Sequence, residues 1–200
     1  MHRYLLIRCI IQDDLAHAKF LYTTGFFIDS NAEAVRTICE FAAANNKPLG
    51  LNLSALFVVQ FYMDAVRNAI KYADYVFCNE EEGSAFANAV GLEAHDRVGV
   101  AKTIASYEKT IPSRPRVVII TQGAAPTIVA TGRHGEEATV ELIEVPAVPL
   151  ESIVDTNGAG DSFVGAFFSA LSNGEDVPSA VRKGNALAGK VIQHSGAIFE

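Results

Sequence analysis

The 200-residue sequence has few cysteines, no tryptophan and no apolar run long enough to cross a membrane. Its three cysteines, Cys9, Cys39 and Cys78, lack metal-ligand or C-x-x-C spacing, so we expect buried, reduced side chains rather than a disulfide framework. The best candidate for a targeting segment, residues 5–11, is interrupted by Arg8 and is far shorter than the roughly 20 apolar residues of a membrane span. We therefore expect no membrane partner and a location in the cytoplasm, or in the nucleus as well.

Positive charge is also scarce. The chain has 16 Lys and Arg against 23 Asp and Glu, a net charge of −7. Proteins that bind nucleic acids usually carry clustered Lys and Arg, so we exclude nucleic acid as a partner. The densest basic spot, residues 114–116, is expected to flank a strand. Half of the residues are hydrophobic, and the length is typical of one folded domain.

Short apolar runs alternate with segments of helical periodicity. Four runs end in polar or glycine residues, at 20–25, 49–54, 75–79 and 117–123. We expect a helix with a Ser30-x-x-Glu33 capping box, a second over about Val59 to Lys71 and a third from Glu80. The alternation predicts an α/β fold in which a mostly parallel sheet is flanked by helices on both faces. After Gly123, strands 127–130 and 139–144 are expected to form a hairpin, followed by two helices near the end of the chain.

The most informative segment is Asp155-Thr-Asn-Gly-Ala-Gly-Asp161, which is followed by a helical pattern. The amides of residues 158–161 would open a helix, where unpaired N–H groups and the helix dipole favour an anion. Asp161 would place a proton acceptor beside that anion, an arrangement suited to phosphoryl transfer to an alcohol. The alternative is a tight turn in which Asp161 is only an acidic cap. Ligands of open parallel sheets bind beyond the carboxyl ends of the strands, and residues 25–27, 54–57, 79–82 and 121–123 lie at four such ends.

The heptapeptide resembles the C-terminal signature of the ribokinase-like carbohydrate and nucleoside kinases. Within that family the chain is most similar to the adenosine kinases, on the segments Gly25-Phe-Phe27, Leu51-Asn-Leu-Ser-Ala55, Gln60-Phe-Tyr62, Asn79-Glu-Glu-Glu82 and Ile120-Thr-Gln-Gly123. The resemblance covers residues 19–200 as a kinase domain, and residues 1–18 match poorly. It implies a ribokinase-like fold and ATP- and Mg²⁺-dependent phosphorylation of the 5′-hydroxyl of adenosine to AMP in purine salvage. We expect a monomer when the protein is full length.

The resemblance also implies roles for individual residues. Asp161 would be the catalytic base, and the anion hole would consist of Asn157, Gly158, Ala159 and Gly160. Asn79 and Glu82 would help to place Mg²⁺, although an acidic first turn of a helix is the simpler alternative. The nucleotide would contact Thr121, Gln122, Gly123 and Asn185, and the simpler account of Asn185 is an exposed helical residue. Phe26 and Phe57 would line the adenosine pocket, with a place in the core as the alternative.

The resemblance leaves out the N-terminal half of the family's fold, including its lid. A site without a lid does not exclude water, so we expect this chain by itself to bind nucleotide weakly and to turn over little. Two other functions stay open from the sequence: another ribokinase-like kinase acting on a sugar, and a lidless nucleotide-binding paralogue with a regulatory role.

Overall fold

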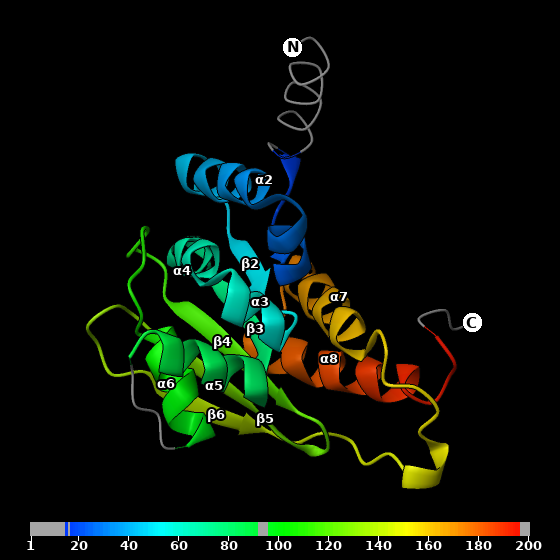
Figure 1. The fold of residues 1–200 in the computed structure, drawn as a ribbon. Coiled ribbons are helices and arrows are strands. Elements are labelled where there is room, and N and C mark those ends of the chain that lie inside the picture. The colour runs from blue at the N-terminus through cyan, green and yellow to red at the C-terminus, as the bar shows by residue number, and fades with distance from the viewer. Residues whose placement is uncertain (1–14, 16, 92–95, 197–200) are drawn as a thin grey trace.

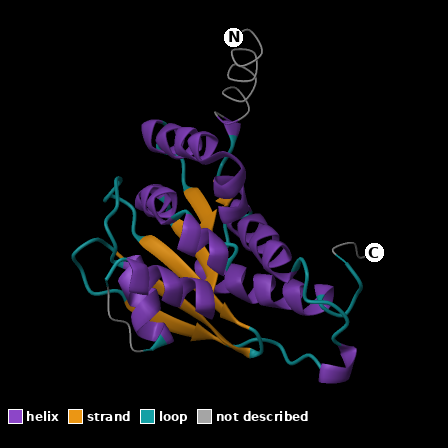
Figure 2. Ribbon diagram, in the orientation of Figure 1, coloured by secondary structure: helices purple, strands orange, loops and turns teal. Residues whose placement is uncertain are grey.

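The computed structural model of the protein describes residues 15, 17–91 and 96–196, which form a six-stranded sheet with helices on both faces (Figures 1 and 2). The strands are β1 (Leu21–Thr24), β2 (Leu49–Asn52), β3 (Tyr75–Asn79), β4 (Arg116–Gln122), β5 (Ala125–Gly132) and β6 (Thr139–Ile143), and they follow one another in space as in sequence. The first four are parallel, whereas β5 and β6 are antiparallel to their neighbours. The predicted α/β class, the mostly parallel sheet and the hairpin are confirmed.

The helices divide into two groups that bury opposite faces of the sheet. One face is covered by α2 (Gly25–Ala44), α3 (Leu56–Phe61), α4 (Met63–Tyr72), α5 (Glu80–Ala89) and α6 (Arg97–Ala105). The other is covered by α7 (Ala159–Ser172) and α8 (Val177–Val191), whereas a short 3-10 helix at Leu150–Ser152 lies away from the sheet (Figure 1). Each β4 side chain therefore meets one of two cores: Val118 and Ile120 belong to the first, and Val117 and Ile119 to the second. Successive side chains of a strand point to opposite faces of the sheet. Because both faces are buried here, residues 117–120 are all apolar, which explains the continuous apolar run in the sequence.

The start of the first helix differs from the prediction. The helix α2 begins at Gly25, where the Thr24 hydroxyl accepts a hydrogen bond from the Phe27 amide at 3.3 Å. The predicted capping box at 30–33 is wrong, because the Ser30 hydroxyl donates within the preceding turn. A kink at Asn31 (φ −162°, ψ 79°) places the cap one residue later, and its side chain accepts from the Ala34 amide at 3.0 Å. Adjacent Ser and Asn are both good N-caps, and the sequence does not distinguish them.

Two other helical predictions need correction. The helix expected over about Val59 to Lys71 is divided at Tyr62 into α3 and α4, and the Tyr62 hydroxyl donates to the Asp29 carboxylate of α2. The helix α6 was not predicted. Its signal was present, because Asp96 caps the helix by accepting from the Gly99 amide, but α6 spans only nine residues and its apolar side chains spread around the axis.

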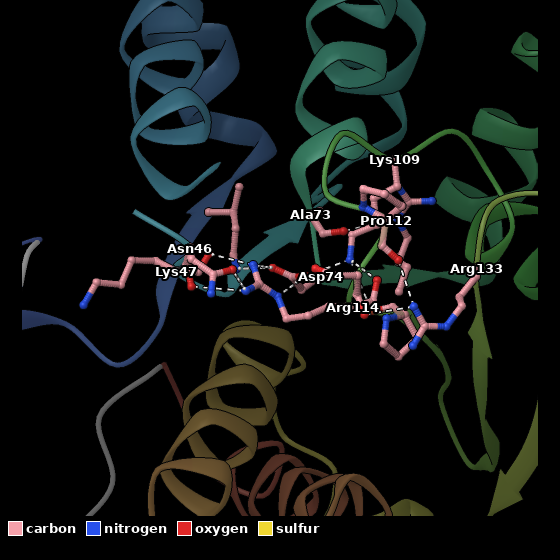
Figure 3. A network of polar contacts seen from close by, with 12 residues as sticks. Asn46, Lys47, Ala73, Asp74, Lys109, Pro112, Arg114 and Arg133 are labelled. Atoms are coloured by element: carbon pink, nitrogen blue, oxygen red, sulfur yellow. Dashed lines mark hydrogen bonds and ion pairs between the residues drawn. The ribbon is translucent and has the colours of Figure 1, made fainter. Parts of the chain in front are cut away.

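A buried cluster of charges joins the amino ends of the strands (Figure 3). The Asp74 carboxylate, which directly precedes β3, accepts from the Leu49 amide at 2.9 Å and from the Lys109 ammonium at 2.7 Å. It also accepts from Arg114 Nε at 2.9 Å, and Arg114 donates onward to the Asn46 carbonyl at 3.1 Å. Asp74 and Lys109 are almost completely buried. The cluster thus fixes the connection before β2, the start of β3 and the segment before β4 with respect to one another.

Next to this cluster, Arg116 closes the ends of two helices. Its side chain is fully buried at the first position of β4. The guanidinium donates all five of its N–H groups at 2.7 to 3.2 Å to the backbone carbonyls of Ile70, Ala73, Ile104, Tyr107 and Glu108. Ile70, Ala73 and Ile104 lie at the ends of α4 and α6, where the last helical C=O groups lack internal partners, and Tyr107 and Glu108 follow α6. Burial lowers the pKa of Arg116 to about 10, so the side chain stays charged at neutral pH.

Other expectations from the sequence concern burial and the membrane. Cys39 and Cys78 are buried free thiols, and burial raises the pKa of both. Cys9 and the segment 5–11 lie outside the described residues. No helix within residues 15, 17–91 and 96–196 combines the length and the apolar character that spanning a bilayer requires.

We expect Asp74→Ala to lower the free energy of unfolding by roughly 3–5 kcal/mol, because it leaves the buried Lys109 ammonium without its carboxylate. Glu141→Ala, at an exposed position of β6, is the matched control and should change stability by less than about 0.5 kcal/mol. Urea denaturation followed by circular dichroism measures both. Equal midpoints for the two variants would contradict the role assigned to Asp74.

Candidate active site

The carboxyl ends of the four parallel strands lie at one edge of the sheet. In the register of the ladder, Thr24 of β1 pairs with Asn52 of β2, and Asn79 of β3 pairs with Thr121 of β4. The helix α7 lies against the same strands, because Phe163 and Phe167 pack on Phe77 with ring centroids 6.3 and 5.1 Å apart. The strand-end segments singled out in the sequence therefore share one edge.

The first part of this edge is a close junction between β1 and β2. A Cβ atom at Gly25 would lie 2.3 Å from the Leu53 carbonyl oxygen, so only glycine fits there. The Gly25 amide donates to the Ser54 hydroxyl at 3.0 Å, and Ser54 itself has a left-handed φ of 69°. The Ser54 amide in turn donates to the Asn52 side chain at 2.9 Å. These contacts fix the start of α2 against the loop that leads into α3.

Two aromatic rings lie beside that junction. Phe26 and Phe57 have ring centroids 6.1 Å apart and are 51% and 39% exposed. The alternative that they belong to the core is therefore wrong. Phe27 and Leu56 at the starts of α2 and α3, and Phe61 at the end of α3, are also exposed, so these helices carry an accessible apolar surface.

The glycine-rich turn opens α7 with free amides. Gly158 has a left-handed φ of 78° and immediately precedes the helix. The Asn157 amide donates to the Asp155 carboxylate at 2.9 Å and the Ala159 amide to the Thr156 carbonyl at 3.3 Å. Within the part of the chain that the structure describes, the amides of Gly158, Gly160 and Asp161 have no partner. Of the expected anion hole, Gly158 and Gly160 thus keep a free donor, and the Asp161 amide joins them.

Asp161 lies exposed in the first turn of α7 and acts on a neighbouring strand. Tyr22 is 36% exposed, and its pKa is raised to about 12, first by the partial burial of its ring and further by the charge of Asp161, while hydrogen bonding to Asn52 opposes the shift. The Asp161 carboxylate therefore lies close enough to Tyr22 of β1 for its charge to act on that hydroxyl. Tyr22 and Asn52 were not singled out as site residues. Only their positions in the sequence could have indicated them, since Tyr22 precedes the end of its strand by two residues and Asn52 ends the next strand.

The turn is braced by the end of α8. Both carboxylate oxygens of Asp155 are occupied, one by the Asn157 amide and the other by the Gly196 amide at 3.2 Å. These amides lower the pKa of Asp155. The Ile192 carbonyl accepts from the amides of Val154 and Asp155 at 2.8 and 3.2 Å. Asp155 thus shapes the loop by tying it to the segment that follows α8.

Asn79 and Glu82 contact one another in a capping box at the start of α5. The Glu82 amide donates to the Asn79 side chain at 2.8 Å, and the Glu82 oxygens accept from the Asn79 amide and Nδ2 at 3.1 and 3.0 Å. Glu82 is buried, and this burial raises its pKa. Because both oxygens already accept hydrogen bonds, Glu82 is suited to contact a Mg²⁺ ion through a water molecule that the ion retains, and not as a direct ligand. Within the described ranges, no three His, Cys, Asp or Glu side chains gather as a metal site.

The expected nucleotide contacts lie in two places. Thr121, Gln122 and Gly123 end β4, and Gly123 turns the chain into β5 with a φ of 59°. Asn185 is buried in α8, where its Oδ1 accepts from the Thr127 hydroxyl at 2.9 Å. The account of Asn185 as an exposed helical residue is therefore wrong, because this side chain fastens α8 to β5.

Together, the sheet order, the helix start with free amides and the adjacent carboxylate define a ribokinase-like α/β protein. The sequence profile described as pfkB family carbohydrate kinase matches residues 5–200, and the chain belongs to that family.

Individual relatives give a narrower comparison. The chain is 40% identical over 182 residues to adenosine kinase 1 of Arabidopsis thaliana, covering 91% of this chain and 52% of that protein. It is also 40% identical to the adenosine kinase of Schizosaccharomyces pombe over 179 residues, which cover 90% and 51% of the two chains. The Anopheles gambiae adenosine kinase in complex with P1,P4-di(adenosine-5) tetraphosphate superposes with a TM-score of 0.84 at 36% identity, covering 91% and 52%. The chain thus spans about half the length of the curated relatives it matches.

Gly25→Ala tests the junction between β1 and β2. We expect it to lower the free energy of unfolding by about 1–3 kcal/mol, because the new Cβ would overlap the Leu53 carbonyl. Gly165→Ala is the control in an open position of α7, where no atom lies within 4 Å of the added Cβ, and it should stabilise the protein by about 0.5–1 kcal/mol. Thermal unfolding distinguishes the two, and a Gly25→Ala protein as stable as the unchanged chain would refute the close approach.

Proposed function

We propose that this chain is the nucleotide-binding and catalytic part of an adenosine kinase, which transfers a phosphoryl group from ATP to the 5′-hydroxyl of adenosine. The observation that carries the proposal is the Asp161 carboxylate beside the amides of Gly158, Gly160 and Asp161, which have no partner in the described ranges. The identity of 40% to adenosine kinases over nine tenths of the chain supports the choice of substrate.

The chemistry divides between the carboxylate and the amides. Asp161 would accept the proton of the attacking hydroxyl, since its side chain is exposed and has no hydrogen-bond partner among the described residues. The amides would stabilise the negative charge of the phosphoryl group during its transfer, and the dipole of the 14-residue helix α7 would add to this stabilisation. The brace between Asp155 and Gly196 would keep these donors in place.

The two substrates would lie along the same edge. The adenine of adenosine would stack against Phe26 and Phe57, whose accessible rings suit a flat purine. The phosphates of ATP would extend along Thr121 to Gly123. Mg²⁺ bound to those phosphates would supply positive charge, and Glu82 would orient its water shell. Asn185 would support the nucleotide site by holding α8, since its amide is already bonded to Thr127 and lies 3.5 Å from the Glu144 carbonyl.

Asp161→Asn is the direct test. We expect AMP formation from adenosine and ATP, slow in this chain, to fall at least about a hundredfold, because the amide cannot accept the hydroxyl proton. MgATP affinity, measured by isothermal titration calorimetry, should stay the same or improve as a negative charge is removed. Undiminished turnover in Asp161→Asn would contradict the proposed role of Asp161 as the proton acceptor.

The acceptor is tested in the same assay. Adenosine, ribose and fructose are compared at equal concentrations with labelled ATP, and we expect labelled product from adenosine alone. Preferential phosphorylation of either sugar would instead favour a carbohydrate kinase, which the family also contains.

A further inference from the structure

An arginine outside the expected site residues reaches the carboxyl edge of the sheet. Arg97 is the first residue of α6, and its NH1 group donates to the Gln122 side-chain oxygen at 2.9 Å. Its NH2 group lies 3.8 Å from the Glu80 carboxylate at the start of α5. The guanidinium therefore lies between the ends of β3 and β4, where Glu80 and Gln122 are found.

The contacts of Arg97 do not account for it as a structural residue. The Glu80 pair is long and partly solvated, with side chains 52% and 32% exposed, and such pairs contribute little to stability. No contact of Nε is found within the described residues. Gln122, in contrast, is anchored, because its Nε2 donates to the Pro126 carbonyl. A fixed amide thus orients a guanidinium whose remaining donors face solvent.

The carboxyl edge of the sheet is rich in negative charge near Arg97. Glu80, Glu81 and Glu82 occupy the first turn of α5, and Asp161 that of α7, in a chain with a net charge of −7. A polyphosphate approaching these four carboxylates would be repelled unless cations compensate. Among the described basic residues, Arg97 is the one whose ion pair and hydrogen bond both involve segments at the carboxyl ends of strands.

We propose that Arg97 binds the polyphosphate chain of the nucleotide, exchanging its weak contact with Glu80 for a phosphate oxygen while Gln122 holds the guanidinium in place. This inference rests on the proposed function and adds to it a residue of the same site. Arg97 reaches the edge from the α5–α6 face and the amides of α7 from the opposite face. Phosphates lying over the ends of β3 and β4 would therefore be contacted from both sides. The planar guanidinium is suited to two parallel bonds to a phosphate group.

Calorimetric titrations with MgATP, inorganic triphosphate and adenosine test the proposal. Arg97→Ala should weaken MgATP and triphosphate binding about tenfold, as expected for the loss of a charge-assisted contact, and reduce the dependence of MgATP affinity on salt. The MgATP and triphosphate affinities of Arg97→Lys should lie between those of Arg97→Ala and the unchanged chain, since lysine keeps the charge but not the paired donors. Adenosine affinity should not change. Arg36→Ala is the matched control, because Arg36 is exposed on α2 and its ion pairs within the described part of the chain are with Glu33 and Glu40 of the same helix.

A second variant guards against an indirect effect of Arg97→Ala on folding. Glu80→Gln removes the competing carboxylate, so it should strengthen MgATP binding severalfold when Arg97 is present and clearly less in the Arg97→Ala background. MgATP affinities within twofold for the unchanged chain and Arg97→Ala, or an equal loss of adenosine binding, would overturn the role of Arg97 alone. Failure of the unchanged chain to bind MgATP would contradict the proposed function and this inference together.

Discussion

The constraint on which the fold depends is the burial of charge at the amino edge of the sheet. Asp74, Lys109 and Arg116 are taken out of water, and each is compensated by direct contacts to a counter-charge or to backbone groups. Arg116 is the extreme case, because five carbonyls from the ends of α4 and α6 converge on one guanidinium. Buried ionic groups of this kind are costly when a partner is lost, so they fix the relative positions of strands and helices more strictly than apolar contacts alone.

The opposite edge of the same sheet has the reverse character. Among the residues that the structure describes, several polar groups there lack a partner, namely three amides before and within α7, the Asp161 carboxylate and the outer donors of Arg97. The aromatic rings of Phe26 and Phe57 at this edge are exposed, in contrast to the buried aromatic side chains of the interior. A sheet that is rigid at one edge can keep such groups in position at the other, where they are available to a ligand. This division follows from the parallel arrangement of β1 to β4, which sends all four amino ends one way and all four carboxyl ends the other.

The sequence predicted the parts of this arrangement that depend on local pattern. Apolar runs gave the strands, and the glycine-rich segment correctly placed Asp161 in the first turn of a helix. The misses lie where local signals are ambiguous or where a tertiary contact decides. Asn31 rather than Ser30 caps the second part of α2, Tyr62 divides a helix by bonding to Asp29, and the short helix α6 was overlooked. Arg116 was expected only to flank a strand, since nothing local indicates that distant carbonyls would enclose its charge.

The same distinction separates the residues that the resemblance assigned to ligands. Glu82 and Asn185 are buried and already bonded to protein groups, so a ligand would have to compete with those bonds or meet the residues indirectly. Asp161 and Arg97 are exposed and keep hydrogen-bonding groups that no other described residue contacts, so a phosphate or hydroxyl gains contacts there without breaking comparable ones. Because a displaced buried hydrogen bond leaves an unsatisfied group, the first pair is better suited to positioning and the second to direct contact. Arg97 thus belongs with the functional groups of this edge, although the motifs that identify the family leave it out.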